Sequence, residues 1–244
     1  MHEPHVLISG GAGGLGRAVC HNLTRQQIPV VVLEIDKDAA KSAVSEIQNA
    51  GGRATMVIGD ITTSAGARAV FEEAVGKVGR INGLVNCAGV FPRRPILEIT
   101  DEDWDFSFSV NVRGLYNLSV CAIEHMRAGG TGGRLVDVAS IDALKTHPNN
   151  AHYAAMKAAV VSLTKSMGLA FAPDGILVNG VAPAAIATDK AKAAGWLPEI
   201  ESKTPIGRAA TPDDIAEVIG FLISEKNRYM VGETVAVSGG YFIP

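Results

Sequence analysis

The sequence predicts an α/β fold in which one seven-stranded parallel sheet carries three helices on each face, a doubly wound arrangement. Three observations support this prediction. Short apolar segments of strand length alternate with amphipathic segments of helix length along the chain. The apolar segments are hydrophobic on both faces, as expected for strands buried between two layers of helices. The 244 residues are 47% hydrophobic and 19% charged, which suffices to bury a large core.

The elements follow in chain order. The expected strands are His5–Ser9, Pro29–Glu34, Arg53–Gly59, Gly83–Asn86, Gly133–Ala139, Ile176–Val181 and Thr234–Val237. The expected helices cover 14–26, 37–50, 64–79, 102–127, 151–172 and 212–224. Two helix starts carry local signals, because Thr100 and Thr211 each stand before acidic first-turn residues and can cap the helix that follows.

The segment 183–208 is the least periodic part of the chain, and we interpret it as a functional loop with one short helix. No internal repeat, low-complexity tract or linker marks a domain boundary. We therefore expect a single domain, 1–244, with 183–208 as a loop region within it.

Composition restricts the partners and the compartment. With 22 basic and 25 acidic residues the formal charge is −3, so we expect neither a nucleic-acid nor a membrane partner. The longest apolar runs have strand length, well below the ~20 residues that span a bilayer. The three cysteines, Cys20, Cys87 and Cys121, do not suggest a disulfide framework. Because the first strand begins by His5, we expect no signal peptide and a cytoplasmic protein.

A glycine-rich turn joins the first strand to the first helix, and it runs Ser9-Gly10-Gly11-Ala12-Gly13-Gly14-Leu15-Gly16. Glycines at such a turn let the backbone approach a pyrophosphate, which the free N–H groups of the helix N-terminus then stabilise. The alternative is a tight turn with a packing role only. Its position in the first strand–helix unit favours a dinucleotide site.

Glu34 ends the second strand, eighteen residues after Gly16. A carboxylate there accepts hydrogen bonds from both hydroxyls of an adenine ribose and repels a 2′-phosphate. Arg17 is the one nearby cation, so the sequence favours NAD over NADP. For Asp36 we favour a helix cap over a cofactor contact.

Together these motifs resemble the short-chain dehydrogenase/reductase family over almost the whole chain. The resemblance implies a Rossmann-type domain and a set of cofactor contacts. Ser9 stands where the family usually has Thr, and Cys87 replaces the second Asn of an Asn-Asn-Ala-Gly motif. The implied cofactor contacts are Ser9, Gly10, Gly14, Leu15, Gly16, Glu34, Asp60, Ile61, Asn86, Ala88, Gly89, Tyr153, Lys157, Pro183, Ile186 and Thr188.

The resemblance also implies a catalytic tetrad of Asn111, Ser140, Tyr153 and Lys157. Tyr153 and Lys157 are four residues apart on one helix and therefore share a face. The lysine ammonium and the positive ring of NAD⁺ would lower the phenol pKa, so that Tyr153 can act as acid and base. Ser140 would hold the substrate oxygen. By resemblance, Lys157 also bonds the nicotinamide ribose and Asn111 holds a relay water.

One departure from the family pattern is Ala184, which stands after Pro183 where the family has Gly. It puts a methyl group beside the nicotinamide or the substrate. Candidate substrate contacts are Phe91, Asp142, Asn150, Ala184 and Trp196. The equal alternative is a local turn cap for Asp142 and Asn150, and core packing for Phe91 and Trp196.

Other polar residues have plainer interpretations. His147 and His152 fit no metal site, so we expect no metal and place both on a loop or helix surface. For Arg93 and Arg94 we favour a solvated pair over an anion site.

The resulting hypothesis is an NAD(H)-dependent oxidoreductase that interconverts a secondary alcohol and a ketone. Alternatives are a 3-oxoacyl-thioester reductase, a sugar or polyol dehydrogenase, and a non-catalytic dinucleotide-sensing regulator. The segment around Trp104 resembles the first of these. Family resemblance further implies a homo-oligomer, usually a tetramer, packed through helices 102–127 and 151–172.

Overall fold

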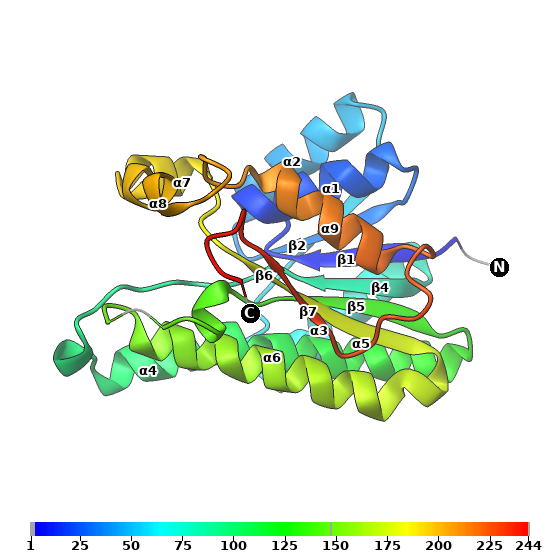
Figure 1. Ribbon diagram of the computed structural model, residues 1–244. Helices are drawn as coiled ribbons and strands as arrows, with labels where there is room; N and C mark the ends of the chain where they lie inside the picture. Colours follow the sequence, from blue (N-terminus) through cyan, green and yellow to red (C-terminus); the bar gives the residue numbers. More distant parts are fainter. Residues whose placement is uncertain (1–2, 147, 244) are drawn as a thin grey trace.

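The computed structural model describes residues 3–146 and 148–243. Seven strands form one sheet in the order β3-β2-β1-β4-β5-β6-β7, and every neighbouring pair is parallel (Figure 1). The strands are β1 His5–Ser9, β2 Val30–Glu34, β3 Ala54–Ile58, β4 Ile81–Asn86, β5 Gly133–Val138, β6 Ile176–Pro183 and β7 Thr234–Val237. The predicted fold class is confirmed. The direction of strand order reverses between β1 and β4, which is where doubly wound sheets bind ligands.

Helices cover both faces of the sheet. Figure 1 shows α1, α2 and α9 on one face and α3, α5 and α6 on the other. Their bounds are α1 Gly14–Arg25, α2 Lys37–Asn49, α3 Ser64–Val78, α4 Asp101–Phe108, α5 Leu115–Gly129, α6 Ala151–Phe171, α7 Asp189–Ala193, α8 Leu197–Lys203 and α9 Pro212–Ile223. Among the described residues, no helix combines the length and apolar character needed to cross a bilayer.

Two apolar cores lie on opposite faces of the sheet. Leu7 and Ile8 are neighbours on β1 and both are fully buried, yet Leu7 packs in the core under α3 and α5 while Ile8 packs under α1 and α9. Successive side chains of a strand point to opposite faces, so a strand covered on both sides needs an uninterrupted apolar run. This is why the strands lack the alternation of a half-exposed sheet.

Local capping fixes where several helices begin. Thr100 and Thr211 each form a full capping box, with Asp103 and Asp214 as the partners. Asp36 caps α2 by accepting hydrogen bonds from the N–H groups of Asp38 and Ala39. These starts agree with the sequence prediction.

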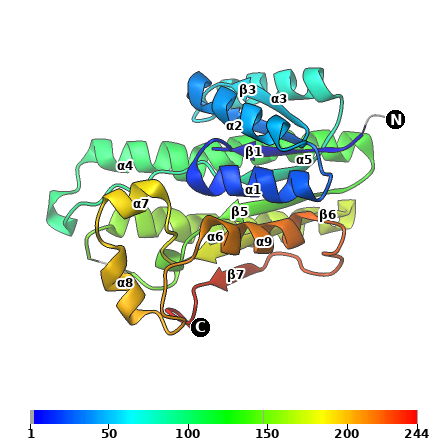
Figure 2. The same cartoon turned by 90° about the horizontal axis from the view of Figure 1, so that it is seen from above.

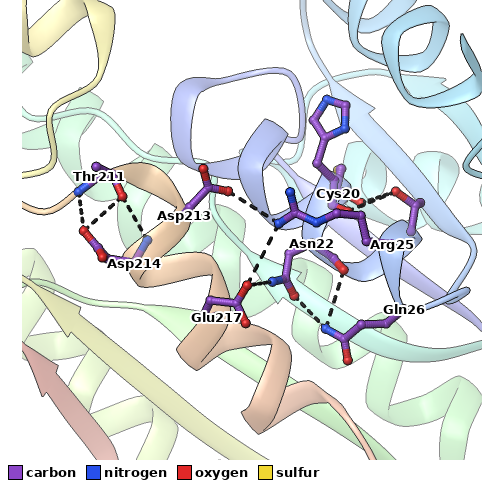
Figure 3. Close-up of polar contacts among 10 residues, drawn as sticks. Cys20, Asn22, Arg25, Gln26, Thr211, Asp213, Asp214 and Glu217 are labelled. Atoms are coloured by element: carbon purple, nitrogen blue, oxygen red, sulfur yellow. Dashed lines mark hydrogen bonds and ion pairs between the residues drawn. The ribbon is translucent and has the colours of Figure 1, made fainter. Parts of the chain in front are cut away.

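A polar seam joins α1 to α9 across one face of the sheet (Figure 3). The buried Asn22 donates from Nδ2 to Glu217 Oε1 at 2.7 Å and accepts at Oδ1 from Gln26 Nε2 at 2.8 Å. Gly220 permits this approach, because a Cβ there would lie 2.3 Å from Asn22 Oδ1. The seam holds the first helix of the sheet against the last.

Two predicted segments need correction. The single helix expected over 102–127 is three pieces, since a π-helical segment, Ser109–Gly114, separates α4 from α5. Its Asn111 donates from Nδ2 to Val90 O and Ser107 O at 2.9 and 3.1 Å, and the wider turn accommodates the added residue. The segment 183–208 holds two short helices, α7 and α8, and not one. Both views place α4, α7 and α8 beyond the carboxyl ends of the strands (Figure 1, Figure 2).

Candidate active site

The glycine turn after β1 has the close contacts that only glycine allows. Gly10 has φ +63°, and a Cβ there would lie 2.9 Å from the backbone of Ala88. A Cβ on Gly16 would lie 2.1 Å from Gly10 O, and one on Gly14 would lie 2.8 Å from Thr188 Cγ2. Gly13 is the N-cap of α1 and offers no side chain to its first N–H groups. The turn therefore presents bare backbone donors to an anion.

The segment after β4 is tied to this turn. Ala88 N donates to Ser9 Oγ at 3.3 Å. The Asn86 side chain points elsewhere, because its Nδ2 donates to Ser119 Oγ at 3.0 Å and to Asp137 Oδ1 at 2.8 Å in the buried interior. Cys87 and Gly89, and not Asn86, line a groove together with the glycine turn. Burial raises the pKa of the Cys87 thiol to about 12, so it stays protonated.

Glu34, Asp60 and Ile61 line one cavity together with Ala88 and Gly89. Glu34 Oε2 accepts from Ala12 N in the glycine turn at 3.3 Å, and Oε1 accepts from Ile35 N at 3.0 Å. These two bonds fix the carboxylate at the end of β2. A bound sugar there would meet a fixed acceptor.

Arg17 is already engaged by an acid. Its guanidinium forms an ion pair with Glu46, and its Nε donates to Ala12 O at 3.4 Å. His21 Nε2 lies 3.9 Å from the same carboxylate of Glu46. The cation that directly follows the glycine turn in the sequence is therefore already paired.

The four residues of the predicted tetrad come from different elements and meet in one groove. The groove has a volume of about 790 Å³ and is lined by Asn111, Ser140, Tyr153 and Lys157 together with the glycine turn, Pro183, Ile186 and Thr188. The groove runs along the carboxyl edge of β1, β4, β5 and β6, where loops of a parallel sheet gather.

Lys157 is buried and Tyr153 is partly buried. Lys157 Nζ donates to Val138 O at 2.7 Å and lies 5.8 Å from the centre of the Tyr153 ring. Burial lowers the pKa of Lys157 to about 8. Burial also raises the pKa of Tyr153 well above its ordinary value, and a hydrogen bond with Ser140 opposes that rise. Burial therefore raises the Tyr153 pKa in this structure, whereas the sequence predicts that the Lys157 ammonium lowers it.

Asn111 fastens the loop after β4. Besides its Nδ2 donations to Val90 and Ser107, its Oδ1 accepts from Val90 N at 3.2 Å. An amide side chain has two N–H donors and two acceptor lone pairs, so three of its four bonds are already made. A water held by Asn111 would use the remaining lone pair or the main-chain carbonyl.

The five predicted substrate residues line a second cavity, of about 240 Å³, that opens beside Ser140 and Tyr153: Phe91, Asp142, Asn150, Ala184 and Trp196. Asn150 Nδ2 donates to Asp142 Oδ2 at 2.7 Å, and Asp142 N donates to Ser140 Oγ at 3.1 Å. One wall is thus a fixed polar chain that ends at Ser140.

Sequence reasoning missed the part that Arg93 plays in this cavity. The expected solvated pair is split. Arg94 binds Asp103 at 2.7 Å, whereas the Arg93 guanidinium lies 4.9 Å from the centre of the Trp196 ring and lines the cavity. From the other segment, the Lys190 ammonium lies 5.4 Å from the centre of the Phe91 ring. No local pattern could reveal the Arg93–Trp196 and Lys190–Phe91 contacts, because the partners are about a hundred residues apart in the sequence.

His152 was expected on a surface and is fully buried. Its ring meets Trp104 edge-on at 6.1 Å, since the start of α6 packs under α4. Neither ring nitrogen has a hydrogen-bond partner among the described residues. Burial lowers the pKa of His152, which keeps the ring neutral. His147 lies outside the described residues.

Comparison with known proteins identifies the family. A family profile described as "Enoyl-(Acyl carrier protein) reductase" matches residues 10–242. A 3-oxoacyl-(acyl-carrier-protein) reductase of Thermotoga maritima is 32% identical over 97% of each chain. This chain belongs to the short-chain dehydrogenase/reductase family. The family resemblance drawn from the motifs is confirmed.

Other short-chain dehydrogenases and reductases match equally well. A cyclopentanol dehydrogenase of Comamonas sp. is 32% identical over 99% of this chain and 98% of its own. A crystal structure of a gluconate 5-dehydrogenase from Burkholderia cenocepacia, in complex with NADP and tartrate, has a TM-score of 0.92 and 29% identity, covering 99% and 96% of the two chains. The relatives' names span acyl, cyclic and sugar-acid compounds. Family membership therefore defines the reaction type and leaves the substrate open.

Proposed function

We propose that this protein is an NAD(H)-dependent oxidoreductase that interconverts a secondary alcohol and a ketone. One observation carries the proposal. Ser140 and Tyr153 line both the groove beside the glycine turn and the smaller cavity walled by Phe91 and Trp196. A cofactor in the first space and an alcohol in the second would meet at these two hydroxyl groups.

The groove suits a nicotinamide dinucleotide. Its donors are main-chain N–H groups at the start of α1, its acceptor is the Glu34 carboxylate, and the glycine contacts leave room where side chains would intrude. The glycine turn would hold the pyrophosphate, Glu34 and Asp60 the adenosine half, and Lys157, Ile186 and Thr188 the nicotinamide half. When bound, the cofactor donates or accepts the hydride.

The proton is left to the protein. In ketone reduction Tyr153 donates its phenolic proton to the substrate oxygen, and the raised pKa of Tyr153 keeps that proton in place until then. In alcohol oxidation Tyr153 must accept it, which the Lys157 ammonium favours by stabilising the phenolate. Ser140 Oγ orients the substrate oxygen, and Asn111 positions a relay water.

The choice of NAD over NADP is supported by two contacts. Ala12 N and Ile35 N hold the Glu34 carboxylate in place. Its negative charge would repel the 2′-phosphate of NADP. Arg17 is paired with Glu46, so its charge is not free to bind that phosphate. Electrostatic repulsion of this kind costs about 1–3 kcal/mol in partly buried sites.

A sugar or polyol substrate is the second candidate, because Asp142 and Asn150 form a polar wall that suits further hydroxyl groups. The acyl-thioester alternative loses one of its signals. Trp104, which suggested it, packs against His152 and does not line the substrate cavity. A non-catalytic sensor would not need Ser140 and Tyr153 to line both the groove and the smaller cavity.

Oligomerisation through α4, α5 and α6 remains part of the proposal. Trp104, Phe106, Phe108 and Tyr116 are large apolar or aromatic side chains on α4 and α5, and each is 38–54% exposed. Large exposed side chains on these two helices are available for contact with another subunit. Light scattering at micromolar concentration should give a tetramer mass; a monomer would contradict this part.

The substrate class is decided by a panel of secondary alcohols, polyols and hydroxyacyl thioesters, each incubated with NAD⁺ while NADH absorbance is followed. We expect the simple secondary alcohols to give the highest kcat/KM. A polyol or thioester at the top of the ranking would replace the leading proposal with the corresponding alternative.

A further inference from the structure

The cavity beside Ser140 and Tyr153 has three further aromatic side chains in its wall, and a cation lies against the ring of each one. The pairs, with the distance from the cationic group to the ring centre, are Arg93 with Trp196 at 4.9 Å, Lys190 with Phe91 at 5.4 Å and Lys145 with Tyr241 at 4.4 Å. The negative face of an aromatic ring attracts a cation, which explains each contact by itself. Together the three contacts gather positive charge around one cavity, and we call Arg93, Lys145 and Lys190 the cationic rim.

No acidic side chain neutralises the cationic rim. Among residues 3–146 and 148–243, none of the ion pairs involves Arg93, Lys145 or Lys190. Arg94, the next residue after Arg93, provides the contrast, because its Nε binds Asp103 Oδ2 at 2.7 Å. The charge of the cationic rim is therefore available to an anion that comes from outside the protein.

Arg93 is the member of the cationic rim that itself lines the cavity. Within the described part of the chain its guanidinium makes no hydrogen bond, so its N–H donors are available to a ligand. A guanidinium presents these donors as a planar fork that matches the two oxygens of a carboxylate. The Trp196 ring restricts the positions of the Arg93 side chain, which reduces the entropy lost when a ligand binds. Arg93 therefore offers a carboxylate site in the substrate cavity.

One acidic side chain, Asp142, also lines this cavity, and it belongs to another part of the wall. Its Oδ2 accepts from Asn150 Nδ2 at 2.7 Å, and its main-chain N–H donates to Ser140 Oγ at 3.1 Å. It forms no ion pair with Arg93, which lies against Trp196. The cavity thus has hydroxyl groups and a polar chain on one side and a cation on the other.

We propose that the substrate is a secondary alcohol that carries a carboxylate, and that Arg93 binds this carboxylate while Ser140 and Tyr153 hold the reacting hydroxyl. The inference rests on the proposed function and narrows its substrate class to hydroxy acids and the corresponding keto acids. The carbinol carbon loses its hydride to the nicotinamide of NAD⁺ and its hydroxyl proton to Tyr153, and a keto acid remains. Lys145 and Lys190 attract the anion toward the cavity without touching the reacting atoms.

The proposal is tested with matched pairs of substrates. Each acid is a methyl carbinol with one to three methylene groups between the carbinol carbon and the carboxylate, and its partner is the primary amide, which has the same shape and no charge. With wild type and NAD⁺, we expect kcat/KM for at least one acid to exceed that of its amide by about tenfold or more. Equal values for acid and amide in every pair overturn the proposal.

Variants of Arg93 show whether this side chain carries the preference. In Arg93→Gln the ratio of acid to amide should fall to within about twofold of one. Arg93→Lys keeps the charge and loses the fork, so an intermediate ratio is expected. Arg94→Gln is the matched control and should retain the wild-type ratio, because Arg94 does not line the cavity. A wild-type preference that Arg93→Gln leaves intact overturns the role of Arg93.

Salt dependence tests the rest of the cationic rim. Because salt screens exposed charges, raising its concentration should lower kcat/KM for the acid more than for the amide. Lys145→Gln should make that decline shallower, and it is preferred to a change at Lys190, which also lines the cofactor groove. The same salt dependence for acid and amide would contradict long-range attraction by the rim.

Binding without turnover separates this inference from the proposed function. The same acids and amides are titrated calorimetrically into the protein alone and into the protein saturated with NADH, where the alcohol cannot be oxidised. We expect tighter binding of the acid by about tenfold or more, and loss of this difference in Arg93→Gln. If no member of the panel is oxidised but this difference is found, the proposed function fails and the carboxylate site stands. Failure of every acid to bind overturns the site.

Discussion

The two halves of the candidate site are built in different ways. On the cofactor side, glycines, strand ends and a helix start form the surface, and the contacts of Gly10, Gly14 and Gly16 leave little freedom. On the substrate side, side chains from the loop after β4 and from the segment 183–208 meet across a cavity, as Arg93 and Trp196 do. Main-chain geometry therefore defines the first half and side-chain packing the second. We expect changes in the two halves to separate in binding measurements.

Tyr153→Phe lies at the junction and should have the largest effect. Loss of the phenolic proton should lower kcat about 1,000-fold or more, which corresponds to ~4 kcal/mol. NADH affinity, followed by fluorescence titration, should stay within about twofold because the ring is retained. Residual turnover within tenfold of wild type would refute the acid/base role.

Asp137→Asn should change how the free energy of unfolding depends on pH. The folded-state pKa of Asp137 is about 6, above the ordinary value of 3.8, so the native state binds more protons between these values and wild type loses stability as pH rises through this window. The variant lacks that loss, and by neutral pH its free energy of unfolding should exceed wild type by up to about 3 kcal/mol. Urea unfolding at pH 4 and pH 7 measures the difference. A gap that does not widen with pH would show that Asp137 is already ionised at pH 4.

Glu34→Ala should reduce cofactor selectivity without altering the substrate half. In wild type we expect kcat/KM for NAD⁺ at least about tenfold above NADP⁺, and the variant should bring the ratio close to one as ~1.4 kcal/mol of repulsion is lost. Asp36→Asn is the control, because it removes a nearby charge but retains the cap of α2. A ratio that persists in Glu34→Ala would locate selectivity elsewhere.

Trp196→Ala should produce the smallest effect and confine it to the substrate half. Loss of one cavity wall and of the Arg93 contact should raise the KM of the alcohol several-fold, about 1 kcal/mol, with NADH affinity unchanged. Trp104→Phe, at the other tryptophan, should leave both constants at wild-type values. Equal losses for cofactor and alcohol in Trp196→Ala would erase the distinction between the two halves.

The contrast also explains what the sequence predicts. The strands, the glycine turn and the caps at Thr100 and Thr211 depend on local chemistry, so their residue types predict them. The π segment around Asn111 and the burial of His152 depend on what packs against them, namely Val90 and Trp104. Residue order does not encode such neighbours, and so one long helix and an exposed histidine were predicted there.

Asn86 illustrates the same limit inside a recognised motif. Its place in the Asn-Cys-Ala-Gly run suggests a cofactor contact, yet its amide is bound to Ser119 and Asp137 in the interior. The motif locates the segment correctly beside the groove, whereas the direction of one side chain within it depends on tertiary packing.

Direct hydride transfer is the central claim, and isotopic labelling tests it most directly. The most reactive alcohol of the panel is prepared with deuterium on its carbinol carbon and incubated with NAD⁺ and enzyme, and the reduced cofactor is examined by mass spectrometry. We predict NADH that carries one deuterium with wild type and essentially none formed with Tyr153→Phe. Unlabelled NADH, or cofactor binding without reduction across the whole panel, would contradict the account.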